Sequence, residues 1–134
     1  MPLVKLGANS LPLAGGTLTG ELILNHRIRS QRWTNQISAL TYAGTTDLDF
    51  DGYGVRTLSL TGDVTFTTSN KAQGRLLKIH LSCDGTPRNF TFPSWIWFQT
   101  PPTAIAASKK GLLTLECAYG ANDTDITACY VEQP

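Results

Sequence analysis

Apolar and polar residues alternate in short runs along most of the chain after residue 36. Leu48 and Phe50 alternate with three aspartates in the run 47–51. In the run 75–81, Leu77, Ile79 and Leu81 fall opposite Lys78 and His80. A period of two residues is typical of strands that bury one face. These runs are therefore predicted to be half-buried β-strands.

Turn-forming residues separate the alternating runs at intervals of about 8–12 residues, which is typical of an all-β sandwich or barrel. The turns are expected at 52–54, 61–63 and 84–87, and the last of these is predicted to close a hairpin between 75–81 and 88–92. The alanine-rich segment 102–110 is a weak helix candidate, with a loop as the alternative. Strands are expected at 47–51, 55–60, 64–67, 75–81, 88–92, 113–117 and 125–132. The predicted fold is all-β, an antiparallel β-sandwich or barrel that follows an extended N-terminal arm.

Residues 1–35 have a different pattern, dense in glycine, threonine and leucine. The glycines can adopt backbone angles that are closed to other residues, and a short apolar strand follows at 22–24. Such a segment cannot bury its own leucines, so it is expected to pack against other chains. We therefore divide the chain into an arm or connector, 1–35, and a β-rich globular domain, 36–134. The residues expected to serve oligomerisation or anchoring are Leu11, Leu13, Gly15, Gly16, Leu18, Gly20, Leu22 and Leu24.

The segment 11–20 reads LPLAGGTLTG, and it resembles the repeat of bacteriophage tail-fibre proteins, whose consensus is close to Leu-Pro-Leu-x-Gly-Gly-Thr-Leu-Thr-Gly. All nine specified positions match without a gap, and the segment occurs once. The parts of the chain at 58–66, 92–95 and 111–115 are more loosely similar to β domains of prophage structural proteins. The resemblance implies a virion protein, usually a homotrimer, in which this segment joins a stem or anchor to the next domain.

The resemblance also implies partners and a location. The expected partners are other copies of the chain, other phage structural proteins and a glycan or protein of the host surface, on a virion assembled in the host cytoplasm. A chain of 134 residues is too short for a long fibre. The function expected from the resemblance is therefore that of a short trimeric tail fibre or tail-associated attachment protein. The alternative is a capsid decoration, cement or head-fibre protein that stabilises the head.

The charge of the chain is low and scattered. Charged residues make up 16% of the sequence, against a typical value of about 25%. This suits a surface partly covered in an assembly, and it suits an ordinary all-β domain equally well. The formal net charge is +1, and the densest basic cluster is Arg27, Arg29 and Arg32, so nucleic-acid binding is not expected. No apolar run has the length of a membrane span, so membrane insertion is not expected.

The three cysteines, Cys83, Cys117 and Cys129, form neither a disulfide framework nor a zinc pattern, because their number is odd and their spacing is wide. They are interpreted as small buried apolar residues with reduced thiols, in a protein assembled in cytoplasm. If the last two strands pair through a turn at Asn122-Asp123, then Cys117 and Cys129 are expected roughly opposite each other, without a bond between them.

The sequence offers few candidates for metal binding or catalysis. Asp47-x-Asp49-x-Asp51 imitates the start of a calcium loop, but the twelfth position holds Leu58 in place of a bidentate glutamate, so a half-buried strand is the preferred interpretation. No pattern of a known catalytic motif includes His26 or His80. We therefore predict no metal, no cofactor and no catalytic residue, and a protein that is not an enzyme.

The most prominent apolar cluster is Trp95-Ile-Trp97-Phe98, which prolines flank on both sides. Strand alternation places Trp95 and Trp97 on one face and Ile96 and Phe98 on the other. The three aromatic residues are candidates for stacking on a receptor sugar or for contacts between subunits. Packing in the core and between subunits is the preferred interpretation, because large aromatic residues are usually well buried.

Overall fold

The computed structural model describes residues 5–6, 9–10, 37–51 and 54–134. The chain divides into two units, Met1–Trp33 and Thr34–Pro134. In the first unit, strands β1 (Lys5–Leu6) and β2 (Asn9–Ser10) pair in antiparallel fashion. The eight arm residues predicted to serve oligomerisation, from Leu11 to Leu24, lie outside the described residues.

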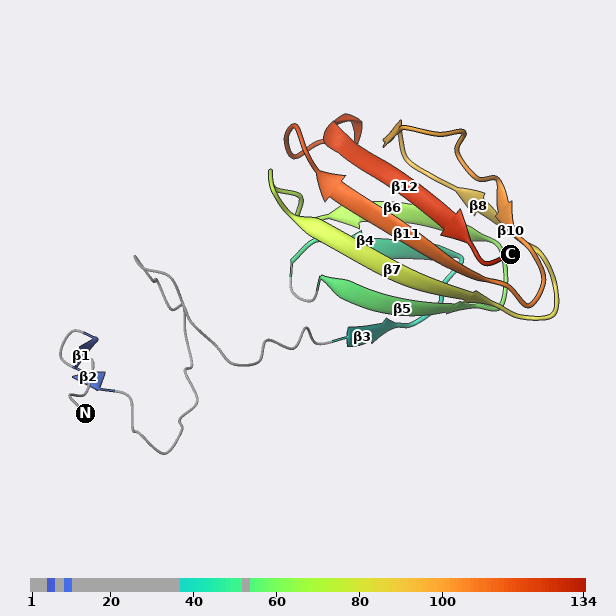
Figure 1. The fold of residues 1–134 in the computed structure, drawn as a ribbon, viewed down its shortest axis with the longest axis horizontal. Helices are drawn as coiled ribbons and strands as arrows, with labels where there is room; N and C mark the ends of the chain where they lie inside the picture. Colours follow the sequence, from blue (N-terminus) through green and yellow to red (C-terminus); the bar gives the residue numbers. More distant parts are fainter. Residues whose placement is uncertain (1–4, 7–8, 11–36, 52–53) are drawn as a thin grey trace. The chain divides into compact units, whose positions relative to one another are not determined.

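The second unit is an all-β sandwich of two sheets, as Figure 1 shows, which confirms the predicted fold class. A six-stranded sheet has the order β3-β5-β7-β11-β12-β9, and a four-stranded sheet has the order β10-β8-β6-β4. A short 3-10 helix, η1 (Asp123–Asp125), connects the last two long strands. The strands are β3 (Ile37–Leu40), β4 (Thr45–Asp49), β5 (Val55–Leu60), β6 (Val64–Ser69), β7 (Leu76–Cys83), β8 (Arg88–Thr91), β9 (Ile96–Trp97), β10 (Ala104–Ile105), β11 (Lys110–Cys117) and β12 (Ile126–Glu132).

From β3 to β8, consecutive strands alternate between the two sheets. The odd-numbered strands β3, β5 and β7 pair in parallel in one sheet, and β4, β6 and β8 pair in parallel in the other. Parallel neighbours need a crossover connection, and here each crossover is the strand that lies in the opposite sheet. The chain therefore makes three stacked turns, and each of the pairs β3–β4, β5–β6 and β7–β8 forms one arch across the core.

This topology corrects three predictions. The turn at 84–87 does not close a hairpin, because β7 and β8 belong to different sheets. The sandwich is mixed and not antiparallel throughout, since the parallel pairs include β12–β9 as well as those of the arches. The segment 102–110 is neither a helix nor a plain loop, because β10 lies in it and pairs antiparallel with β8.

The core lies between the two sheets and includes the apolar residues that the alternation placed on one face of a strand. Leu48 lies on β4 and Phe50 directly after it. Leu77, Ile79 and Leu81 lie on β7 of the opposite sheet, and all five side chains are buried. The other large side chains buried with them include Leu58, Leu60, Phe66, Phe90, Ile105, Leu113, Leu115, Ile126 and Tyr130.

Side chains at the turns connect successive arches. The Tyr42 hydroxyl donates a hydrogen bond to the Asp63 carbonyl over 2.9 Å, joining the first arch to the second. The Asp63 carboxylate accepts hydrogen bonds from the Asn89 backbone N–H and side-chain amide, at 2.8 and 3.1 Å, joining the second arch to the third. The Asn89 backbone N–H, followed by its side-chain amide, lowers the pKa of Asp63. These contacts stabilise the stacking of the arches.

The last hairpin, β11–β12, corrects the cysteine prediction. Cys129 pairs in register with Thr114 and Cys117 with Ile126, so the two thiols are not opposite each other. Cys117 is buried in the core as predicted, but the predicted burial is wrong for Cys129, which is exposed on the other face of the sheet, and Cys83 is only partly buried. All three cysteines are free thiols, as predicted, and burial raises the pKa of Cys83 and of Cys117.

Candidate functional site

An aromatic groove opens where the chain passes from β8 through β9 to β10. It has a volume of about 470 Å³. Its lining contains four aromatic rings, three prolines and two threonines, and no charged side chain: Phe90, Thr91, Phe92, Pro93, Trp95, Trp97, Pro101, Pro102 and Thr103. We call this feature the aromatic groove.

Two sheet edges hold the lining in place. β9 pairs in parallel with β12, which sets Trp97 beside Ala128, and β10 pairs with β8. The Phe90 backbone N–H donates to the Thr103 carbonyl over 2.8 Å, so the two threonine-bearing segments are tied together. The prolines stiffen the connecting segments because their φ angle is nearly fixed.

A continuous series of ring contacts runs from the core to the groove. Phe66 stacks on Phe92 with ring centroids 5.4 Å apart and planes 8° from parallel. Phe92 in turn contacts Trp95 at 5.3 Å and Trp97 at 4.9 Å, and the two indoles lie 6.0 Å apart. The buried Phe66 therefore supports the outer rings of the groove wall.

The two tryptophans differ in burial. Trp95 retains 6% of its surface and belongs to the core, as the packing interpretation predicts, whereas Trp97 is half-buried. The Trp95 indole N–H is buried and has no hydrogen-bond acceptor among the described residues. A buried donor without an acceptor costs about 1–3 kcal/mol, and most native donors are paired. The buried position of the Trp95 indole N–H therefore carries this cost.

A second surface lies on the outer side of the six-stranded sheet. Outward positions of β3, β7 and β12 carry large apolar side chains with high exposure, and Phe98 lies over the same side of the sheet. The exposed fractions are 64% for Ile37, 53% for Leu76, 78% for Phe98 and 61% for Val131. We call these four residues the apolar outer face.

Phe98 is separated from the two tryptophans with which it was grouped. It lines a pocket of about 160 Å³ together with Thr114, Glu116, Thr127 and Cys129 on the apolar outer face, away from the aromatic groove. The next residue, Gln99, donates a side-chain hydrogen bond to the Tyr130 carbonyl over 2.6 Å, which attaches this segment to β12. The three aromatic candidates therefore divide between two sites.

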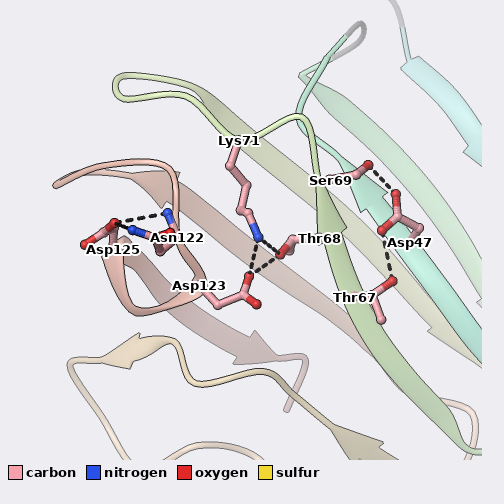
Figure 2. Close-up of polar contacts among 8 residues, drawn as sticks. All are labelled: Asp47, Thr67, Thr68, Ser69, Lys71, Asn122, Asp123 and Asp125. Atoms are coloured by element: carbon pink, nitrogen blue, oxygen red, sulfur yellow. Dashed lines mark hydrogen bonds and ion pairs between the residues drawn. The ribbon is translucent and has the colours of Figure 1, made fainter.

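Each aspartate of the calcium-like pattern has a side-chain partner: Asp47 and Asp49 bind residues on β6 or directly after it, and Asp51 forms an ion pair with Arg75 over 3.5 Å. The Asp47 carboxylate accepts hydrogen bonds from the hydroxyls of Thr67, at 2.9 Å, and Ser69, both on β6 (Figure 2). Asp49 accepts a hydrogen bond from the Asn70 side-chain amide at 2.8 Å, and this bond lowers the pKa of Asp49. The pattern is therefore explained by cross-strand hydrogen bonds.

A second polar cluster attaches the loop between β11 and β12 to the end of β6. Lys71 Nζ lies 3.0 Å from the Asp123 carboxylate and 3.3 Å from the Thr68 hydroxyl, which itself donates to Asp123 (Figure 2). Within the loop, Asn122 donates to Asp125 from its backbone and its side chain. We call this cluster the loop anchor, because Thr68 and Lys71 at the end of β6 both bind Asp123 of the loop.

Comparisons with known proteins return nothing similar: no protein-family model, curated protein or solved structure matches the chain. Within the described part of the chain, no group of three or more histidine, cysteine, aspartate or glutamate side chains is placed to hold a metal ion. Among the same residues, no helix is long and apolar enough to cross a membrane.

Sequence reasoning missed two features of these surfaces. Thr91 and Thr103 line the aromatic groove, but each stands in a segment whose pairing partner could not be read from the pattern. The apolar outer face was missed because Ile37, Leu76 and Val131 lie on different strands, and only the strand order brings them to one side of the sheet. The exposed Leu76 at the start of the 75–81 run was the one available signal, since it breaks the alternation.

Proposed function

We propose that this protein is a structural component of a tailed-phage virion, acting as a short homotrimeric tail fibre or tail-associated attachment protein. The observation that supports this best is the apolar outer face. Four large apolar side chains are exposed on this one side of the sheet, and burying them against another chain would be favourable. The tail-fibre resemblance of LPLAGGTLTG supplies the kind of assembly.

A second copy of the chain is the occupant that the chemistry of this face favours. Lys78 and Glu116 lie on the same outward side of the sheet, on β7 and β11, so the face carries both charges beside its apolar residues. A surface with both signs of charge can be complementary to another copy of itself. A strongly basic or acidic partner would instead require one dominant charge.

The proposal is tested by locating the protein on the particle and measuring its mass. Immunogold electron microscopy of phage particles should place the label on the tail, and light scattering of the purified chain should give three times the mass of one chain. A label on the head would favour the capsid decoration alternative. A stable monomer at micromolar concentration would contradict the proposed homotrimer.

A further inference from the structure

The aromatic groove has the size and lining of a site for a small ligand. Its volume of about 470 Å³ falls in the range of about 300–1,000 Å³ that is usual for such sites. The lining has no charged side chain, so ion pairs cannot contribute to recognition. A ligand bound here would therefore be held by ring contacts and hydrogen bonds.

Polar groups accompany the aromatic rings. Thr91 and Thr103 are both exposed, and their hydroxyls can donate and accept hydrogen bonds. Trp95 lies in the same lining, but its indole N–H is buried and offers no donor at the groove surface. A purely apolar ligand, such as an acyl chain, would satisfy none of these groups.

We infer that the aromatic groove binds a neutral saccharide, with a sugar ring against Trp97 and Phe92 and its hydroxyls on Thr91 and Thr103. A sugar ring combines an apolar face of C–H groups with a rim of hydroxyls, which matches rings flanked by threonines. The ring contacts and the flanking prolines hold the wall in place, so little conformational freedom is lost on binding.

This inference deepens the proposed attachment role, on which it rests for its biological meaning, by naming the class of receptor. The two can fail separately. Saccharide binding is measured on the purified chain, whereas the virion role is measured by microscopy of particles. Loss of one result leaves the other unchanged.

The experiment uses the full chain and four neutral probes: maltotriose, cellotriose, lactose and N,N′-diacetylchitobiose. Binding is measured by saturation-transfer NMR and by tryptophan fluorescence. At least one probe should bind. T91V and T103V should each weaken its binding by about two- to tenfold, the usual worth of one hydrogen bond. W97A should weaken it by about tenfold or more, and W97F, which keeps a ring, should weaken it less.

The matched control is T65V. Thr65 pairs in register with Thr91 and is exposed, but it does not line the groove, so this variant should bind the probe as the natural chain does. The inference is overturned if no probe binds at millimolar concentration, or if T91V, T103V and W97F all bind unchanged. It is equally overturned if W97A changes only the mass in light scattering, because the groove would then be a contact between subunits.

Discussion

Single residues decide how closely the strands of this sandwich approach one another. Gly111 lies on the inner side of β11, where the Tyr130 ring from β12 covers it. Burial and the nearby Glu132 carboxylate raise the pKa of Tyr130, so its hydroxyl stays protonated and donates to Glu132 over 3.1 Å. A glycine in a strand often marks such a close approach. The ring takes the space that a side chain at 111 would need.

We therefore expect Gly111→Ala to destabilise the fold. An added Cβ would lie 2.6 Å from two atoms of Tyr130, which is itself buried and cannot move freely. Overpacking of this kind costs about 1–3 kcal/mol, measured as a loss of the free energy of unfolding in urea. Gly85→Ala is the control, because nothing lies within 4 Å of a Cβ at that position. Equal stability of the two variants would contradict the expectation.

The loop anchor at Asp123 predicts a dependence on pH. Burial alone raises the pKa of Asp123, but the hydrogen bonds from Thr68 and Lys71 outweigh it, and the net pKa lies below the usual value of 3.8. The stability that the anchor contributes is therefore present above pH 3.8, and it is lost as the pH falls through the lowered pKa. Carboxyl NMR titration should show this low pKa, and Lys71→Met should raise it. An unchanged pKa in the variant would show that Lys71 does not contribute.

The elements show how far the sequence could predict the fold. The alternation predicted the inward residues of β4, β7 and β11, because the period of two holds for any strand that buries one face. It could not tell an arch from a hairpin. The turn Asp84-Gly-Thr-Pro87 has the same residues that hairpins use. Whether it forms a hairpin or an arch depends on whether the next strand joins the same sheet or the opposite one. That choice depends on contacts distant in the sequence.

The contacts between arches predict a second stability effect. Tyr42→Phe removes the hydroxyl that donates to the Asp63 carbonyl and keeps the ring that packs against the core. The expected cost is about 0.5–1.5 kcal/mol, the usual worth of one hydrogen bond. Tyr119→Phe is the control, because Tyr119 is 66% exposed. Thermal unfolding should therefore show a lower midpoint for the first variant only.

The candidate site was predicted in part. The cluster Trp95-Ile-Trp97-Phe98 drew attention to the right segment, and the burial of Trp95 agrees with the packing interpretation. The pattern placed Phe98 on the other face from the tryptophans, and the structure adds that this face belongs to a separate pocket. The groove itself could not be predicted, because its wall combines three segments that only the pairing of β8 with β10 and of β9 with β12 brings together.

At the scale of the whole molecule, the two ends of the sandwich differ. Among the described strands, β3 and β4 are the edge strands at one end, and β9 and β10 at the other are two residues long and lie near Pro93, Pro101 and Pro102. Short strands and prolines block further pairing at an edge, since proline has no N–H to donate. The closed end carries the aromatic groove and is therefore suited to a ligand. In the trimer that we propose, the apolar outer face makes the contacts between subunits.

Two parts of the molecule are candidates for the self-association that we propose, the glycine- and leucine-rich arm and the apolar outer face. All of the buried core among the described residues lies between Thr46 and Tyr130. A chain of residues 36–134 should therefore fold with an unchanged melting temperature.

If the outer face drives assembly, this truncated chain stays trimeric in light scattering, although it no longer attaches to the virion. The full-length variant L76K/V131K should then become monomeric, because six charges per trimer would be buried between subunits. Y119K, which adds a lysine at an exposed residue outside the outer face, should stay trimeric. A truncated chain that is monomeric, together with a trimeric L76K/V131K, would instead assign assembly to the arm.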